Sequence, residues 1–256
     1  MSRRRTILLA LLVLAAPISL CAAGPAPSPG RGMARIPAGS YLPLYAAGHR
    51  RVEVAAFELD RYPVTRAQYL EFVRRHPEWR RSRVGSAAYL SDWRGDLDFG
   101  GAADARRPVT RVPRAAAQAF CAVEGKRLPT TDEWEYAAGA GPNRRDAASD
   151  PAFRQRLLEL YTRPRGAAPG PVGSTFRNAF GVFDLHGLVW EWVQDAMPAG
   201  HAHHAGSAHD MGCAGSANGA TDADDYPSFL RYAFRAALTP DAALGTLGFR
   251  CARPVR

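Results

Sequence analysis

The stretch that decides the fold covers residues 125–138 and has the sequence GKRLPTTDEWEYAA. Thr130 and Glu133 stand three positions apart, which is the spacing of a capping box at the start of a helix. The helix that they open carries Trp134 and Tyr136 and runs into a Gly-Ala-Gly segment. We therefore expect a short helix here, with both aromatic residues available for packing.

Two further helices precede this stretch. Thr65 and Gln68 form a second capping pair, followed by apolar residues at helical spacing until Pro77. An alanine-rich segment at 114–123 predicts another helix, which ends at Gly125 as a C-cap glycine would end it.

The rest of the chain predicts short elements. Residues 150–161 begin with an Asp-Pro pair, which supplies an N-cap and a proline at the first helical position, and continue as an amphipathic helix. Residues 35–41 and 52–59 alternate in the manner of short strands. After Pro164 we expect loops and short strands to the end. The predicted fold class is α+β.

Composition favours one loop-rich globular domain. The 256 residues contain 46% hydrophobic and 22% charged residues, which excludes a disordered tail and a membrane bundle. The 24 glycines and 20 prolines indicate many turns. The charge is +9, but the arginines occur in scattered pairs and form no basic stripe. Nucleic-acid binding is therefore not expected.

The N-terminus has the pattern of an export signal. Residues 1–23 combine three early arginines, a short apolar stretch and small residues before the expected cleavage. A lipoprotein anchor on Cys21 and a twin-arginine route are weaker alternatives. We expect a signal peptide at 1–23, a leader at 24–32 and one domain at 33–256, located in the periplasm or secreted, with no membrane span after cleavage.

Several blocks together resemble the formylglycine-generating enzyme, or sulfatase-modifying factor, family. They are GKRLPTTDEWEYAA at 125–138, NAFGVFDLHGLVWEW at 178–192 and LGFRCA at 247–252, with shorter matches at 35–39 and 62–69. The resemblance covers about residues 33–254. It implies a single α+β domain related to the C-type lectin fold. It does not settle activity, because the family contains oxidases, synthases and proteins of unknown chemistry.

The resemblance implies a structural calcium ion. Asp184, Gly187, Val189 and Glu191 match positions that surround calcium in similar proteins, and carboxylate and carbonyl oxygens suit this ion. The alternative is that Glu191 caps a helix or pairs with an arginine. A second calcium site of the family has no matching pattern here.

The resemblance also implies a disulfide between Cys121 and Cys251, the alternative being two buried thiols. Cys213 is then left without a partner. An accessible thiol of this kind is a candidate for chemistry, and a buried inert cysteine is the alternative.

Similar enzymes that make formylglycine hold Cu(I) between two cysteines near the C-terminus. The matching stretch here is Thr221 to Arg235, with Thr221 or Asp222 near the first position and Pro227 near the second. Cu(I) prefers soft thiolate ligands, which these residues cannot supply. We therefore expect that this chain lacks the copper dithiolate.

Other residues match the family's cleft. Arg235 fits its pocket arginine, Trp190 an aromatic wall and Ser216 a pocket serine, with Cys213 nearby. A separate group of histidines could hold a transition metal, although a flexible polar loop is the alternative. The histidines are His201, His203, His204 and His209.

Three functions remain open at this point. The first is an exported accessory or maturation protein that acts on or binds a periplasmic protein or small molecule. Leu188 and the helix at 150–161 resemble the branch that accompanies nitrite-reductase systems. The second is an oxidoreductase that uses Cys213 or the histidines. The third is a calcium-stabilised, lectin-like binding module.

Overall fold

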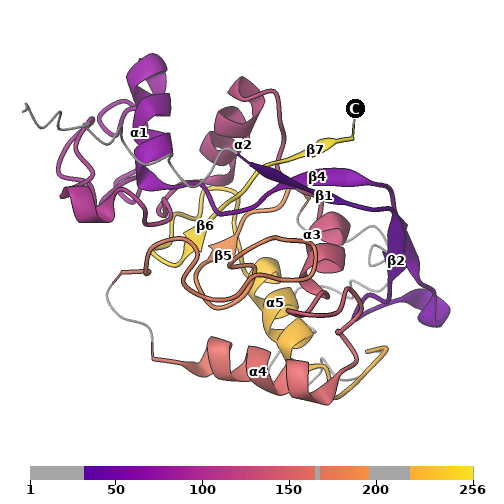
Figure 1. The fold of residues 1–256 in the computed structure, drawn as a ribbon. Coiled ribbons are helices and arrows are strands. Elements are labelled where there is room, and N and C mark those ends of the chain that lie inside the picture. Colours follow the sequence, from indigo (N-terminus) through magenta and orange to yellow (C-terminus); the bar gives the residue numbers. More distant parts are fainter. Residues whose placement is uncertain (1–31, 165–167, 196–219, 256) are drawn as a thin grey trace, which may run out of the picture.

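The computed structural model describes residues 32–164, 168–195 and 220–255 (Figure 1). A three-stranded antiparallel sheet has the order β1-β4-β7, formed by β1 (Met33–Ile36), β4 (Phe57–Asp60) and β7 (Ala252–Pro254). Two smaller sheets pair β2 (Gly39–Tyr41) with β3 (Val52–Val54) and, in parallel, β5 (Trp190–Glu191) with β6 (Leu247–Gly248). Strands from both ends of the chain thus meet in one sheet.

The three helices predicted in the first half of the chain are confirmed. They are α1 (Arg66–Arg75), α2 (Arg114–Val123) and α3 (Thr131–Ala138). Thr65 and Thr130 each cap a helix, and in both capping boxes the third helical residue bonds back to the cap. Short 3-10 helices occupy Ala47–His49, Pro77–Trp79 and Ala102–Asp104.

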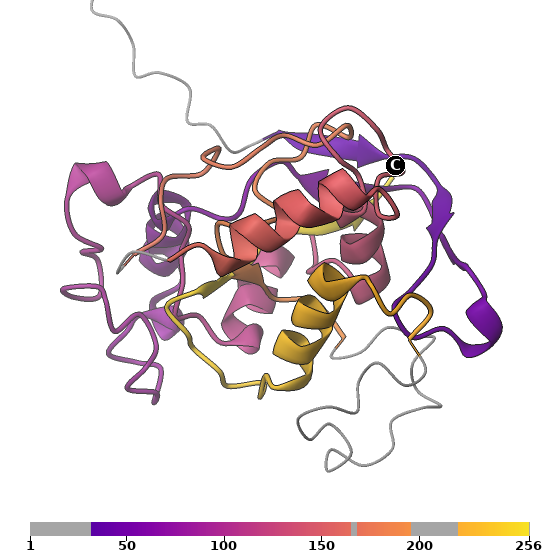
Figure 2. The same cartoon turned by 90° about the horizontal axis from the view of Figure 1, so that it is seen from below.

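The second half of the chain departs from the prediction in one segment. Helix α4 (Pro151–Thr162) is confirmed, with Asp150 as its N-cap. Helix α5 (Tyr226–Ala236) occupies a region where we expected loops and short strands, and that prediction is wrong. Asp225 caps α5 by accepting from the backbone of Ser228, and Pro227 stands in the first turn, where its missing N–H costs no bond. Figure 2 shows α4 and α5 side by side.

Two large apolar clusters form most of the core, and a smaller third one contains Ala147, Phe153 and Leu157. One contains aromatic residues of α1 and α2, and Tyr69, Phe72 and Phe120 pack there in mutual contact. The other large cluster joins the three-stranded sheet to α3. A disulfide links Cys121 of α2 to Cys251 before β7, across 130 residues, with Cα atoms 5.6 Å apart. It fastens the first cluster to the sheet.

The molecule is an α+β domain with short elements, as the sequence predicted. Among the described residues, every helix is too short or too polar to span a bilayer. The expected signal peptide and most of the leader lie outside the described residues. The relation to C-type lectins stays a prediction.

Candidate functional site

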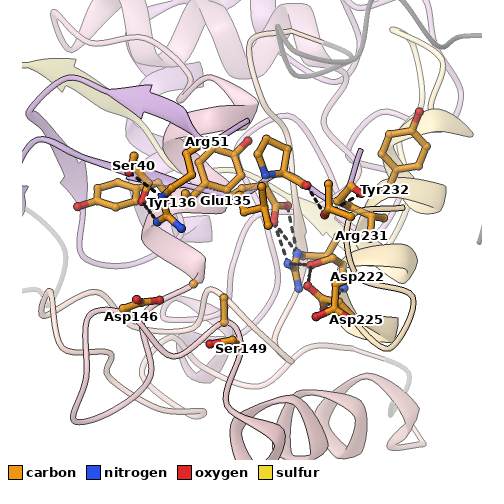
Figure 3. Close-up of a pocket in the computed structure, with 18 of the residues that line it drawn as sticks. Ser40, Arg51, Glu135, Tyr136, Asp146, Ser149, Asp222, Asp225, Arg231 and Tyr232 are labelled. Carbon is orange, nitrogen blue, oxygen red and sulfur yellow. Dashed lines mark hydrogen bonds and ion pairs between the residues drawn. The ribbon is translucent and has the colours of Figure 1, made fainter. Parts of the chain in front are cut away.

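A cavity of about 340 Å³ opens between β2, α3, α5 and the loop that leads into α4 (Figure 3). Its lining is mainly polar and aromatic. The residues that bear charge or a phenol are Tyr41, Arg51, Glu135, Tyr136, Arg145, Asp146, Arg154, Asp222, Asp225, Arg231, Tyr232 and Arg235. A larger hollow of about 870 Å³ lies along α4, but no buried charged side chain lines it. We therefore take the smaller cavity as the candidate site.

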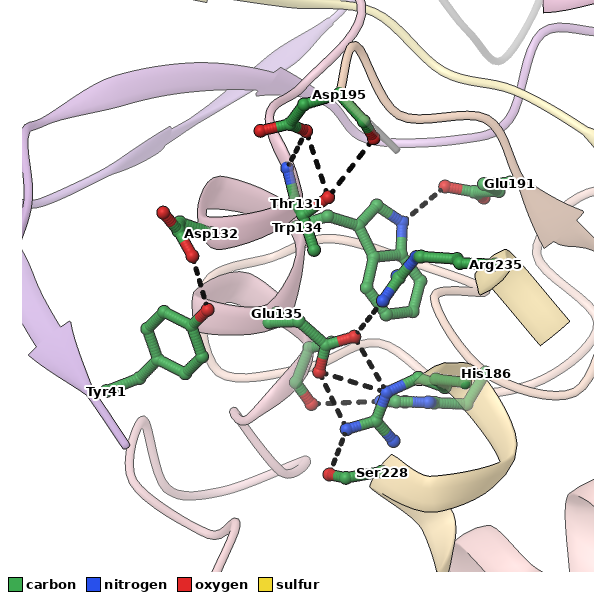
Figure 4. A network of polar contacts seen from close by, with 12 residues as sticks. Tyr41, Thr131, Asp132, Trp134, Glu135, His186, Glu191, Asp195, Ser228 and Arg235 are labelled. Carbon is green, nitrogen blue, oxygen red and sulfur yellow. Dashed lines mark hydrogen bonds and ion pairs between the residues drawn. The ribbon is translucent and has the colours of Figure 1, made fainter. Parts of the chain in front are cut away.

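Glu135 is the centre of an ion-pair network in this cavity (Figure 4). Helix α3 presents its carboxylate to two arginines of α5, which stand four residues apart and so share one helix face. Arg231 donates from Nε to both oxygens of Glu135 at 3.0 Å and from Nη2 to Oε2 at 2.8 Å, and Arg235 donates from Nη1 to Oε1. The side chains of Glu135, Arg231 and Arg235 are 13%, 7% and 10% exposed. The charged groups of this network are therefore largely shielded from water.

The network keeps Glu135 ionised. Burial alone would raise the pKa of this carboxyl, but Arg231 and Arg235 outweigh burial and lower its pKa to about 2. Glu135 in turn raises the pKa of Arg231 and overcomes the opposite effect of burial. Glu135 and Arg231 are therefore both charged at neutral pH.

A buried hydrogen-bonded chain supports the network from α4. Arg231 approaches the hydroxyl of Tyr161 at 3.4 Å, and this hydroxyl contacts Nδ1 of His186 at 2.6 Å. Nε2 of His186 lies 2.9 Å from the carbonyl of Ala138, which can only accept, so Nε2 donates and Nδ1 accepts from Tyr161. Burial, then the charge of Arg231, lowers the pKa of His186 to about 3. The imidazole is neutral and connects Tyr161 of α4 to Ala138 at the end of α3.

Trp134 joins this site to a second ion pair. The guanidinium of Arg235 lies over its ring, 4.7 Å from the centroid. Its indole N–H donates to Glu191 at 2.8 Å. Glu191 accepts two bonds of 2.7 Å from Arg250, and both side chains are fully buried. One tryptophan thus touches two separate carboxylate–arginine assemblies.

The residues expected to bind calcium do not fit this ion as they are placed. Asp184 accepts from the backbone N–H groups of Gly173 and Thr175 and from the hydroxyl of Thr175. Glu191 is paired with Arg250, which is the alternative left open by the sequence. The described residues contain no group of three or more acidic, histidine or cysteine side chains that could hold a metal. Calcium at these positions stays an expectation from the family resemblance alone, and the pairing of Glu191 with Arg250 favours the alternative.

The stretch matched to the copper cysteines is occupied by protein contacts. The hydroxyl of Thr221 donates to the carbonyl of Pro43 at 2.7 Å, and Asp222 pairs with Arg154. Pro227 is buried in the first turn of α5. The cysteines of the chain are four: Cys21, Cys121, Cys213 and Cys251.

Only part of the predicted cleft can be placed. Arg235 lines the cavity, whereas Trp190 lies outside the lining and stacks on Phe234 and Tyr161 with centroids 4.5 and 5.3 Å away. The remaining candidates lie outside the described residues. They are Cys213, Ser216, His201, His203, His204 and His209.

Sequence reasoning missed Glu135 and Arg231, which are central to the cavity. Glu135 stands inside the quoted family block, but its arginine partner is 96 residues away. The four-residue spacing of Arg231 and Arg235 would have given a signal once that segment was assigned to a helix.

The fold and the order of these segments match one class of proteins. A family model described as the sulfatase-modifying factor enzyme 1-like domain matches residues 21–255. The chain therefore belongs to this family, which the sequence blocks had indicated.

Individual relatives differ in what their names say. The inactive C-alpha-formylglycine-generating enzyme 2 of Mus musculus is 31% identical, and the match covers 79% of this chain and 77% of that protein. The formylglycine-generating enzyme of Streptomyces coelicolor is 29% identical, covering 94% and 96%. Since one relative is named inactive and the other as an enzyme, family membership does not fix the activity of this chain.

Solved structures support the same fold. The structure of CarF has a TM-score of 0.52 at 18% identity, covering 88% of this chain and 98% of that one. PvdO from Pseudomonas aeruginosa has a TM-score of 0.50 at 21% identity, covering 87% and 94%.

Proposed function

We propose that this chain is an exported accessory or maturation protein that binds a periplasmic protein or small molecule in the cavity between α3 and α5, without the copper dithiolate of formylglycine-generating enzymes. The binding site is the cavity around Glu135, Arg231 and Arg235. Under this proposal, the chain has the fold of the family but does not carry out the family's copper-dependent oxidation.

The observation that carries the proposal is the structure of residues 221–235. This stretch offers a hydroxyl bonded to Pro43, a carboxylate paired with Arg154, and a proline in a helix. A copper dithiolate needs two free cysteines. Residues 221–235 contain no cysteine, and Cys121 and Cys251 are joined to each other in a disulfide. The helical form of the stretch serves instead to place two arginines in the cavity.

An aldehyde assay tests this proposal. The purified chain, loaded with Cu(I) under air, is incubated with a cysteine peptide from a sulfatase, and aldehyde is trapped with a hydrazide and counted by mass spectrometry. The Streptomyces coelicolor enzyme serves as positive control. We expect no aldehyde above the level given by copper and peptide alone. Turnover by the chain would refute the proposal.

The cellular setting is proposed on separate grounds. The export pattern of residues 1–23 and the disulfide between Cys121 and Cys251 both favour an oxidising compartment. The partner proposed is a component of a copper nitrite-reductase system, because the segment around Leu188 resembles that branch. Mass spectrometry of periplasmic fractions would locate the mature N-terminus. Co-purification with the reductase, compared with a Glu135→Gln variant, would test the partner.

A further inference from the structure

Arg235 presents unused hydrogen-bond donors to the cavity. Its Nη1 donates to Glu135, but Nε and Nη2 make no hydrogen bond to any residue in the described part of the chain. The side chain is nine-tenths buried and lines the cavity. Arg231, by contrast, uses all three nitrogens on Glu135, Ser228 and Tyr161. Neither Nε nor Nη2 of Arg235 is among the fully buried polar atoms that lack a partner, so both N–H groups stay accessible and can donate to a ligand.

The charges around the cavity favour an anionic ligand. Of the four acidic residues in the lining, Glu135 and Asp222 pair with arginines, and Asp225 bonds to Ser228 as the cap of α5. Asp146 is the fourth acidic residue of the lining. Arg51 and Arg145 have no carboxylate partner among the described residues.

Both of these arginines are held in place by other contacts. Arg51 is anchored to Ser40 by bonds of 2.9 and 2.7 Å, and Arg145 lies over the ring of Phe180 at 5.5 Å. The lining counts five arginines against four acidic residues, so one positive charge is left over.

We propose that the cavity binds a ligand through a carboxylate that pairs with the Nε and Nη2 edge of Arg235. This inference rests on the proposed function, because it names the chemistry of the ligand that the same cavity receives. A guanidinium edge with two parallel N–H groups matches the two oxygens of a carboxylate. Tyr136 and Tyr232 line the same cavity and provide aromatic surface for the uncharged part of the ligand.

The size of the cavity limits the ligand. A volume of about 340 Å³ lies at the small end of the range of roughly 300–1,000 Å³ found for small-molecule sites. The ligand is therefore a small carboxylate or one acidic side chain of a partner, and the chemistry at Arg235 is the same in both.

Calorimetric titration of the purified chain tests the proposal with matched probes. One pair is the tripeptide acetyl-Gly-Glu-Gly-amide and its glutamine counterpart, and the other is glutarate and glutaramide. We expect binding of at least one acid, with the uncharged counterpart weaker by about ten- to a hundredfold. The acid that binds better identifies the source of the carboxylate. Equal binding of acid and amide, or no binding of either acid, would overturn the proposal.

Variants locate the binding. Arg235→Gln should weaken the acid by about ten- to a hundredfold, and Arg235→Lys, which keeps the charge but loses the planar edge, should recover only part of it. Arg107→Gln is the matched control, since Arg107 pairs with Asp104 outside the cavity. Unchanged affinity in a folded Arg235→Gln variant would contradict the assignment.

A second variant protects the test against misfolding. Arg145→Gln changes an exposed residue and should weaken the acid by about threefold without unfolding the chain. Should Arg235→Gln fail to fold, Arg145→Gln decides, and an unchanged affinity there refutes the proposal. The outcome is separate from the aldehyde assay. If the chain produces aldehyde and also binds the carboxylate, only the proposed function is refuted. If it produces no aldehyde and does not bind the carboxylate, only this inference is refuted.

Discussion

Two carboxylate–arginine assemblies lie on different sides of Trp134, and they differ in how completely they are closed. Arg250 and Glu191 are fully buried. The guanidinium of Arg250 donates to Glu191 and to the carbonyls of Asp60, Arg61 and Phe183, so all three of its nitrogens have partners. Arg235 and Glu135 border the cavity, and two nitrogens of Arg235 have no hydrogen-bond partner among the described residues.

Both assemblies are carboxylate–arginine pairs, but the Arg250–Glu191 pair stabilises the fold, whereas the Arg235–Glu135 pair lies where a ligand can bind. Arg250 ties β4, the loop before β5 and the end of β6 together, so its charge serves the fold. The arginines of α5 meet α3 at a surface that still admits a ligand. Burial and charge alone would not have distinguished the two assemblies, whereas the count of satisfied donors does.

The largest loss of stability is expected at the fully buried pair of Arg250 and Glu191. Arg250→Gln leaves Glu191 buried without its counter-charge, which should cost about 3–5 kcal/mol of the free energy of unfolding. Urea denaturation at pH 7 measures this. The control is Arg253→Gln, a nearby arginine whose partly exposed pair with Glu58 should contribute about 0–1 kcal/mol. Equal costs for both variants would show that burial adds nothing to the contribution of the Arg250–Glu191 pair.

At the open pair, Glu135→Gln should cost about 3 kcal/mol at neutral pH, because the folded-state pKa of Glu135 is about 2 against an ordinary value of 4.5. A lowered folded-state pKa gives stabilisation that is complete above pH 4.5 and is lost as the pH falls to about 2. The difference between wild type and variant should therefore shrink across that window in urea titrations. A difference that is constant with pH would contradict the ionic account.

His186 predicts a smaller pH effect at higher pH. Its folded-state pKa is about 3 against 6.5, so the unfolded chain takes up a proton that the folded chain refuses, and stability falls as the pH drops below 6.5. The loss should be about 2 kcal/mol between pH 6.5 and 5. His186→Gln, which keeps a donor toward Ala138, should flatten the stability profile in this range. A wild-type slope retained in the variant would show that other groups titrate.

The smallest effect concerns calcium. With Glu191 paired to Arg250 and Asp184 bonded to a loop, adding millimolar calcium or a chelator should leave the melting temperature unchanged. Differential scanning calorimetry of the purified chain measures this. A calcium-dependent rise that disappears in Asp184→Asn would restore the family's calcium site and show that these hydrogen bonds give way to the ion.

Local signals in the sequence were enough for most helices. The boxes at Thr65 and Thr130 and the Asp-Pro pair before α4 each lie within four residues, so their physics is visible in the sequence. Helix α5 was missed although Asp225 and Ser228 form a cap of the same kind. The arginines on one face of this helix find their carboxylate partner on α3, far away in the sequence, which no local pattern shows.

The site was less predictable because its contacts are distant in sequence. Arg235 was expected in the cleft from the family pattern, but Glu135 and Arg231 are 96 residues apart. Glu191 was expected either at calcium or beside an arginine, and only the packing of residues 59 positions apart identified Arg250 as its neighbour. Such pairings follow from tertiary packing, which no local pattern encodes.

The position of Trp134 has an optical consequence. Its indole ring is covered by the guanidinium of Arg235, and its N–H is fixed on Glu191. A negative group arriving at Arg235 changes the electric field along this ring while the ring itself stays clamped. A carboxylate that pairs with Arg235 should therefore shift the fluorescence emission of Trp134, which is one of five tryptophans in the chain.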